Sequence, residues 1–182
     1  MSKSCSLLLT KICFIGDYDP LSQDEAREKL ALPKDKLLVM CVGAFYEWKG
    51  VPLLLEAWRR NFINDEQKEL VLIGGTPHEL PAELRGIPHT VIIPHVPSDT
   101  IATYLRAADI LVLPNIPVTE EAIRYTSPIK LFEYMASGRP IVASDLPSIR
   151  EIVSDEMVLF AKAGDADDLA SKVSLLAADG AL

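Results

Sequence analysis

The chain has 182 residues, enough for one sizeable α/β domain and too few for two domains of ordinary size. Hydrophobic residues make up 49% and charged residues 24%, which excludes a disordered chain and a disulfide-stapled scaffold. The formal net charge of −8 argues against a general nucleic-acid-binding protein, because contacts to a phosphate backbone need a basic face. Any phosphate bound by this chain must therefore be held locally.

The amino-terminal segment is the part of the chain that fits least easily into a fold. Its apolar stretch at 7–15 is interrupted by Thr10 and Lys11, so it is too short to span a membrane, and no small-residue cleavage signature follows it. We interpret residues 1–20 as the tail of an interdomain linker or the cut edge of a longer protein. We expect one domain over residues 21–182.

Cysteine usage and charge bear on the compartment. Cys5, Cys13 and Cys41 stand in no metal-ligand spacing, and Cys41 lies in an apolar run. This pattern favours a reduced, cytoplasmic environment. The net negative charge gives the chain little attraction to an anionic membrane. We therefore expect any membrane association to come from a further domain of a longer protein, one that is missing from this chain.

Apolar, strand-like runs alternate with helix-like runs from residue 37 onward, and short connections join them. Most of the strand-like runs are continuously apolar, as strands buried on both faces are. The alternation predicts an α/β fold, a Rossmann-like parallel sheet of about six strands with helices on both faces. The predicted strands are 37–42, 70–73, 90–93, 110–113, 141–144 and 157–160.

The helices are predicted from their end signals. Ser22 and Glu25 form a plausible capping box for a helix over 24–30, and an apolar stripe of helical period follows Gly50. The remaining helices are expected to begin at Ser98, to cover 129–137 between the cap Ser127 and the terminal glycine Gly138, to cover 147–153, and to begin at Asp165 with Asp168 three residues later.

The loop after the first strand carries the first candidate binding residues. In an open parallel sheet, ligands bind beyond the carboxyl ends of the strands. Gly43 ends the strand, and Lys49 and Gly50 precede the next helix. A glycine lets the backbone approach a ligand and a lysine supplies a point charge, a combination that suits a diphosphate. The alternative is a solvated Lys49 beside a glycine that only turns the chain.

The predicted helix over 129–137 carries the second set. Its start offers the backbone N–H groups of Ser127, Ile129 and Lys130 to an anion, because Pro128 has none. Glu133 lies about one and a half turns further on, among apolar residues. Such a carboxylate either faces solvent or accepts hydrogen bonds from a specific partner.

Other motifs give little support to competing chemistries. His95 stands in a short loop between a strand and a helix, where a lone histidine is more often structural or exposed than functional, and His78 and His89 have no partners for a metal or a triad. No G-x-S-x-G or P-loop pattern is present, and the glycines of 73–76 lack the G-x-G-x-x-G spacing. Hydrolase and NAD-binding functions are therefore not favoured.

Three stretches, read in order, resemble the C-terminal nucleotide-sugar-binding domain of group 1 (family four) retaining glycosyltransferases, which have the GT-B architecture. These stretches are 42–57, 105–114 and 127–144, of which the last, beginning SPIKLFEYMASGRP, is the most specific. The resemblance implies that a nucleoside-diphosphate sugar is held between two domains, and that the N-terminal acceptor domain is missing. It further implies transfer to a carbohydrate or lipid-linked acceptor, with no metal and no cofactor.

The resemblance also assigns roles to residues. Lys49 matches the residue that neutralises the diphosphate, and Glu133 matches the glutamate that binds the ribose, so these two are the candidate catalytic residues. The other implied binding residues are Gly43 and Gly50 near the diphosphate, Ser127, Ile129 and Lys130 around the phosphates, and His95 and Val96 against the base.

Two positions depart from the family pattern. Tyr125 stands where the motif has its first glutamate, and Glu120 and Glu121 come too early to replace it. A further basic residue often found near Tyr46 is absent. The first departure favours one alternative, a non-catalytic nucleotide-binding or interaction module of the same fold. A nucleotide-sugar epimerase is a further alternative, although the acidic and histidine residues expected of one are not evident in the sequence. The sequence does not indicate which nucleotide, sugar or acceptor is used.

Overall fold

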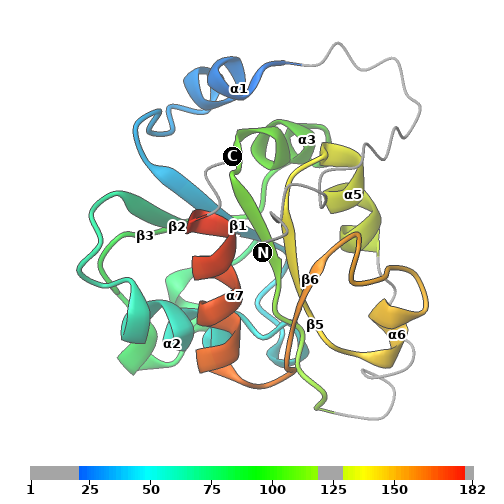
Figure 1. The fold of residues 1–182 in the computed structure, drawn as a ribbon. Helices are drawn as coiled ribbons and strands as arrows, with labels where there is room; N and C mark the ends of the chain where they lie inside the picture. Colours follow the sequence, from blue (N-terminus) through cyan, green and yellow to red (C-terminus); the bar gives the residue numbers. More distant parts are fainter. Residues whose placement is uncertain (1–20, 119–128, 179–182) are drawn as a thin grey trace.

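The computed structural model describes residues 21–118 and 129–178 (Figure 1). The linker assignment for 1–20 and the predicted helix cap at Ser127 lie outside these residues. In the described part no helix is both long enough and apolar enough to cross a membrane.

A single six-stranded parallel sheet forms the centre of the described structure, in the order β3-β2-β1-β4-β5-β6. This confirms the predicted α/β class and strand number. The strands are β1 (Leu37–Val42), β2 (Lys68–Ile73), β3 (Thr90–Ile93), β4 (Ile110–Leu113), β5 (Ile141–Ser144) and β6 (Leu159–Ala161).

Two strand boundaries differ from the prediction. Strand β2 begins two residues early, at Lys68, because Lys68 and Glu69 pair in register with Leu37 and Leu38. The predicted strand 157–160 was placed too early. The N–H groups of Met157 and Val158 donate to the carbonyl of Ser154, so these residues close a turn before β6 begins.

Helices cover both faces of the sheet (Figure 1). On one face, α1, α3, α5 and α6 pack over a core that includes Met40, Leu111 and Tyr134. On the other face, α2 and α7 pack on each other and on a core that includes Leu55 and Trp58. The helices are α1 (Gln23–Lys29), α2 (Val51–Asn61), α3 (Ser98–Ala107), α5 (Ile129–Ser137), α6 (Pro147–Arg150) and α7 (Ala166–Ala178).

Strand β1 shows why its sequence is apolar at every position. Met40 and Val42 point into one core, whereas Val39 and Cys41 point into the other, because successive side chains of a strand point to opposite faces. A strand covered by helices on both sides has no solvent-facing positions, which explains the continuous apolar run.

The predicted helix ends are partly confirmed. Ser22 and Glu25 form the full capping box at α1. At α7, Asp165 accepts from the N–H of Asp168, but Asp168 accepts from the N–H of Lys162 instead of capping back, so this cap is one-sided. Helix α6 ends at Arg150, before the predicted end at residue 153, because the N–H of Ile152 donates to the carbonyl of Ile149, three residues back, and interrupts the helical ladder.

A buried ion pair ties α1 to the amino ends of β1 and β4. The guanidinium of Arg27 lies 2.6 Å from the carboxylate of Asp109 and also donates to the carbonyls of Ala107 and Lys36. Asp109 in turn accepts from the N–H of Leu38 at 2.6 Å. This amino-end cluster, Arg27 with Asp109, therefore joins three elements that are distant in sequence.

Candidate functional site

Strands β1 and β4 lie side by side in the sheet although two other strands separate them in the chain. The connections leave these two strands in opposite directions, toward β2 and toward β5, so a crevice is expected beyond their carboxyl ends. Three segments meet at this place, namely the loop from Gly43 to Gly50, the loop from Pro114 to Val118, and the start of α5.

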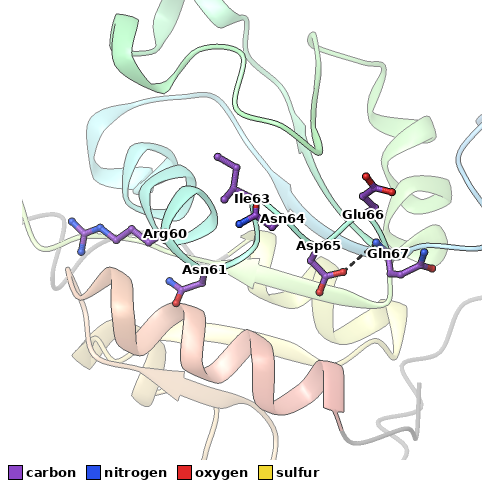
Figure 2. A pocket seen from close by; sticks show the side chains of 7 residues that line it. All are labelled: Arg60, Asn61, Ile63, Asn64, Asp65, Glu66 and Gln67. Carbon is purple, nitrogen blue, oxygen red and sulfur yellow. Dashed lines mark hydrogen bonds between the residues drawn. The ribbon is translucent and has the colours of Figure 1, made fainter.

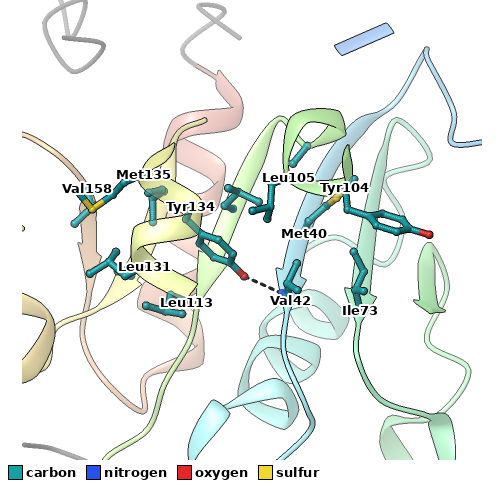
Figure 3. Close-up of a cluster of buried hydrophobic side chains, with 14 of the residues drawn as sticks. Met40, Val42, Ile73, Tyr104, Leu105, Leu113, Leu131, Tyr134, Met135 and Val158 are labelled. Carbon is teal, nitrogen blue, oxygen red and sulfur yellow. Dashed lines mark hydrogen bonds between the residues drawn. The ribbon is translucent and has the colours of Figure 1, made fainter. Parts of the chain in front are cut away.

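Tyr134 sets the position of α5 over the crevice. Its ring is fully buried, and its hydroxyl oxygen accepts from the N–H of Val42 at 2.8 Å (Figure 3). The same oxygen lies 3.5 Å from the carbonyl oxygen of Val112. Val42 and Val112 belong to β1 and β4, so the hydroxyl bonds where the two strands end. The first turn of α5 is thereby fixed beyond the end of β1.

The loop after β1 is clamped to the loop after β4. The N–H of Ile116 donates to the carbonyl of Trp48 at 2.9 Å. Gly50 has φ 69°, and a Cβ placed on it would lie 1.8 Å from the carbonyl oxygen of Pro114. Gly50 is therefore explained by close packing, whereas its predicted contact with a ligand stays a prediction.

Lys49 is a half-buried cation in this clamped loop. Its Nζ lies 4.0 Å from the centre of the Trp48 ring, a cation–π contact that holds the ammonium group in place. Burial lowers the pKa of Lys49, and the charge of Lys130 lowers it further. Cys41 offers no compensating anion, because burial raises the pKa of its thiol to about 12.

The surroundings of Lys49 leave room for an anionic ligand. A Cβ built on Gly43 would meet nothing closer than Cε of Lys49, at 4.0 Å, so the backbone face of Gly43 is open. Among the described residues, no carboxylate forms an ion pair with Lys49. The cation and the open backbone are the two features predicted for a diphosphate site, and here they adjoin.

Glu133 is neither fully exposed nor buried, and its partner is a neighbour on the same helix. Its carboxylate accepts from Nζ of Lys130 at 2.7 Å, and the two side chains are 36% and 26% exposed. The prediction allowed either solvent or a specific partner, and the structure shows a partner that the sequence alone did not single out.

The remaining predicted site residues are spread more widely. Ile129 begins the described part of α5 with a 61% exposed side chain, and Ser127 lies outside the described residues. His95 is exposed in the loop between β3 and α3, whereas Val96 is half-buried and packs against the core. Contact of His95 and Val96 with a base stays a prediction.

Sequence reasoning missed two residues that build the site, Trp48 and Tyr134. Trp48 stands directly before Lys49, and stacking of its ring on Tyr46 at 6.5 Å gives it a second support. Tyr134 follows Lys130 by four residues, so the two side chains lie on the same face of α5. This spacing was the available sequence signal that Tyr134 and Lys130 face the ends of the strands together.

A hollow of about 530 Å³ lies elsewhere, in the turn that joins α2 to β2, and is lined by side chains between Arg60 and Gln67 (Figure 2). This turn precedes β2, so the hollow lies at the amino end of the sheet, opposite the crevice. No group of three or more His, Cys, Asp or Glu side chains among the described residues is arranged to hold a metal ion.

The fold and the site together define a Rossmann-like α/β domain with a cationic loop at the junction of its two halves. A family model described as glycosyl transferases group 1 matches residues 36–179. The chain belongs to this family, which confirms the resemblance drawn from the sequence motifs.

Curated relatives agree with this assignment. The chain is 30% identical to D-inositol 3-phosphate glycosyltransferase of Streptosporangium roseum over 152 residues, which are 76% of this chain and 33% of that protein. It is also 30% identical to phosphatidyl-myo-inositol mannosyltransferase of Mycobacterium leprae over 159 residues, covering 85% of this chain and 41% of that one. The chain therefore spans about a third of the first relative's length.

Solved structures share the fold. The C-terminal domain of a glycosyl transferase group 1 family protein from Francisella tularensis superposes with a TM-score of 0.69 at 22% identity, covering 86% of this chain and 82% of that one. Sucrose-phosphate synthase from Thermosynechococcus elongatus gives a TM-score of 0.68 at 26% identity, covering 86% of this chain and 40% of that one.

Proposed function

We propose that this chain is the donor-binding domain of a retaining glycosyltransferase, and that it holds the nucleoside diphosphate of a nucleotide sugar where β1 and β4 end. The observation that carries the proposal is Lys49, a half-buried ammonium group beside the open backbone of Gly43, without a carboxylate partner among the described residues. Burying an unpaired charge is unfavourable. A diphosphate supplies the missing anion.

Each residue of the site then has one task. Lys49 neutralises the diphosphate and stabilises the negative charge that grows on it as the bond to the sugar breaks. The start of α5 adds the N–H groups of Ile129 and Lys130, with Ser127 preceding them in the sequence, and a favourable helix dipole. Glu133 accepts hydrogen bonds from the ribose hydroxyls.

The reaction exchanges one bond at the anomeric carbon of the sugar. The carbon loses the diphosphate oxygen and gains an acceptor hydroxyl oxygen with the same configuration, and the acceptor proton is released. We expect neither a metal ion nor a cofactor to be required, because Lys49 and the backbone N–H groups meet the charge of the leaving group. A second domain would complete the sugar site and hold a carbohydrate or lipid-linked acceptor.

The names of related proteins support this direction. The Anabaena protein HepE, whose fold matches at a TM-score of 0.64, has been solved in complex with UDP-glucose. The relatives named above are described as transferring sugars to inositol-containing acceptors. The nucleotide, sugar and acceptor of the present chain are left unassigned in this proposal.

Exposed apolar side chains support the presence of a covering domain. Among the described residues, five large apolar side chains are exposed. Four of them, Tyr46, Val118, Ile129 and Phe132, belong to the three segments that meet at the crevice, and the fifth, Leu175, lies on α7. Large apolar side chains gathered on one edge mark surfaces that another protein surface covers. A second domain facing this edge would close the site around the nucleotide sugar.

One sequence feature favours a second candidate, a nucleotide-binding module without transfer activity. Tyr125 replaces the first motif glutamate, which is expected near the donor sugar, and it lies outside the described residues. Such a module would bind the nucleoside diphosphate as proposed, but the sugar would add little to its affinity. Comparing the affinity for a nucleotide sugar with that for its diphosphate separates the two candidates.

The test of nucleotide binding is a calorimetric titration of the chain with UDP, GDP and ADP, in the wild type and in two variants of Glu133. Hydrogen bonds to a charged group contribute about 1.5–3 kcal/mol, so Glu133→Ala should weaken the affinity about ten- to a hundredfold. Glu133→Gln keeps the shape and one acceptor oxygen, and should weaken it less.

Glu28→Ala is the matched control, because Glu28 is also a helix carboxylate paired with a lysine, Lys34 at 2.9 Å, but lies at the amino end of the sheet. It should leave the affinity unchanged. Wild-type protein that is folded but binds none of the three diphosphates would refute the proposed function. Unchanged affinity in Glu133→Ala would remove Glu133 from the site.

A further inference from the structure

The ion pair between Lys130 and Glu133 conflicts with the task proposed for Glu133. The carboxylate that is to accept the ribose hydroxyls already accepts from Nζ of Lys130 at 2.7 Å. Both side chains are partly exposed, at 26% and 36%, so a ligand can reach them. Ribose binding must therefore displace Lys130 from this carboxylate or share it.

Lys130 lies on the side of α5 that faces the strand ends. It precedes Tyr134 by one helical turn, about 6 Å along the axis, on the same stripe of the helix. The hydroxyl of Tyr134 bonds at Val42, the last residue of β1. Lys130 therefore lies beyond the end of β1, on the side of Gly43 and Lys49, and its charge adds to the lowering of the Lys49 pKa.

A lysine is an unfavourable residue at this position for helix stability alone. A cation in the first turn opposes the helix dipole, and a lysine that precedes its glutamate has the weaker of the two orders. Lys130 nevertheless stands close enough to Lys49 for the two positive charges to interact, and Lys49 lies beside the open backbone of Gly43. Two cations suit an anion that carries two or more charges.

We propose that the side chain of Lys130 adds a second ammonium group to the diphosphate site, beyond the backbone N–H already assigned to this residue, and that Glu133 holds it as a counter-ion until the ligand arrives. On binding, Nζ of Lys130 moves from the carboxylate of Glu133 to a phosphate oxygen, and the freed carboxylate accepts the ribose hydroxyls. This inference rests on the proposed function and adds an exchange of partners to it. It also explains how the site manages without a second basic residue in the loop after β1.

The exchange predicts opposite effects of one variant on two ligands. Inorganic pyrophosphate has the charge of the diphosphate but no ribose. Glu133→Gln releases Lys130 without removing any contact to pyrophosphate, so it should bind pyrophosphate about two- to fivefold more tightly than the wild type. The same variant should bind a nucleoside diphosphate more weakly, because the ribose loses its carboxylate.

The experiment is a calorimetric titration of pyrophosphate and of UDP, GDP and ADP into the chain and its variants. Lys130→Met should lower the affinity for pyrophosphate, and for the nucleoside diphosphate that the wild type binds, about tenfold or more. Lys130→Arg should restore most of this affinity. Lys172→Met is the control, because Lys172 also pairs with a carboxylate of its own helix, Asp168 at 3.6 Å, with 31% exposure. Lys172→Met should leave the affinity for both ligands unchanged.

The outcomes separate this inference from the proposed function. If the wild type binds a nucleoside diphosphate but Lys130→Met binds it equally well, the exchange is overturned and the proposed function stands. Weaker pyrophosphate binding in Glu133→Gln would overturn the exchange in the same way. If the folded wild type binds no nucleoside diphosphate, both proposals fail. Melting curves confirm folding, which a partly exposed ion pair affects little.

Discussion

Lys49 combines burial with charge, and burial shifts its protonation equilibrium toward the neutral amine. Burial lowers its pKa below the ordinary 10.5, and the positive charge of Lys130 lowers it further. The cation–π contact with Trp48 favours the charged form. An anionic ligand would favour the charged form further, so binding and protonation of Lys49 are coupled.

This coupling gives a pH prediction. In the proposed function, a diphosphate binds to charged Lys49, so affinity should be full below the lowered pKa and should fall as pH rises through it, before pH 10.5 is reached. The measurement is calorimetric affinity for the bound diphosphate from pH 7.5 upward, where the phosphates are fully ionised because their last pKa is about 6.

Lys49→Arg supplies the comparison, since arginine stays charged throughout this range. Its affinity should fall less steeply with pH than that of the wild type. Parallel curves for the two proteins would assign the pH dependence to another group, and Lys49 would then have no role in it.

The sequence predicts Gly43 and Lys49 at the end of β1 and the start of α5 at the same edge, because the loops that follow parallel strands meet there. The structure brings Gly43 and Lys49 together. The charge of Lys130, the partner of Glu133, acts on Lys49. The sequence was not sufficient to show how the side chains are held. The contact of Lys49 with Trp48 depends on the turn of the loop, and the pairing of Glu133 with Lys130 depends on rotamers. The i,i+3 spacing of Lys130 and Glu133 permits their pairing, but spacing does not show which rotamers they adopt. Nor does spacing show how the loop brings Lys49 to Trp48.

At the level of elements, the loop after β1 and the loop after β4 behave as one unit. Gly50 permits their contact, because any side chain at this position would overlap the carbonyl of Pro114. Sequence reasoning recognised Gly50 as part of a binding motif, but the reason for glycine is a tertiary contact with a loop more than 60 residues away in the chain. Only the three-dimensional structure reveals it.

Two glycines with the same backbone angle separate this contact from backbone strain. Gly50 and Gly86 both have φ 69°, but a Cβ on Gly86 meets nothing within 4 Å. Gly86→Ala should destabilise the fold by about 1–2 kcal/mol, the cost of a left-handed alanine. Gly50→Ala should destabilise it by clearly more, because a Cβ 1.8 Å from the Pro114 oxygen forces the two loops apart.

Unfolding in urea, monitored by circular dichroism, gives both free energies. Equal losses in the two variants would mean that the loops separate without cost and that the clamp is weak. In that case Gly50 would regain its predicted importance as a residue that contacts the ligand.

The same distinction explains which element boundaries could be predicted. Strands β1, β3, β4 and β5 were bounded correctly because each is an apolar run between polar residues or turn formers. The start of β6 was wrong, since Met157 and Val158 are apolar but their N–H groups bond back to Ser154. An apolar sequence indicates where the chain is buried, not where strand pairing begins. Here Val158 is already buried, but β6 begins only at Leu159.

At the level of the whole molecule, the charged residues at the two ends of the sheet have different roles. The amino-end cluster, Arg27 with Asp109, ties α1 to β1 and β4 with a buried ion pair whose partners are 5% and 12% exposed. The carboxyl end holds Lys49, whose charge is disfavoured in the folded chain without a ligand. At one end the buried charges are paired, while at the other the charge of Lys49 carries a cost that the proposed anionic ligand would relieve.

This division predicts that Arg27→Met and Lys49→Met have opposite effects on folding stability and on nucleotide affinity. Arg27→Met leaves Asp109 without its ion-pair partner and should lower the free energy of unfolding by about 3–5 kcal/mol, with nucleotide affinity of the folded protein unchanged. Lys49→Met removes a desolvated charge and should leave the ligand-free melting temperature equal or higher, while nucleotide affinity falls at least tenfold. Calorimetric titrations and melting curves on both variants, at a temperature where Arg27→Met is folded, measure the four quantities. A loss of affinity in Arg27→Met, or a lower melting temperature in ligand-free Lys49→Met, would show that the two ends are not separated in this way.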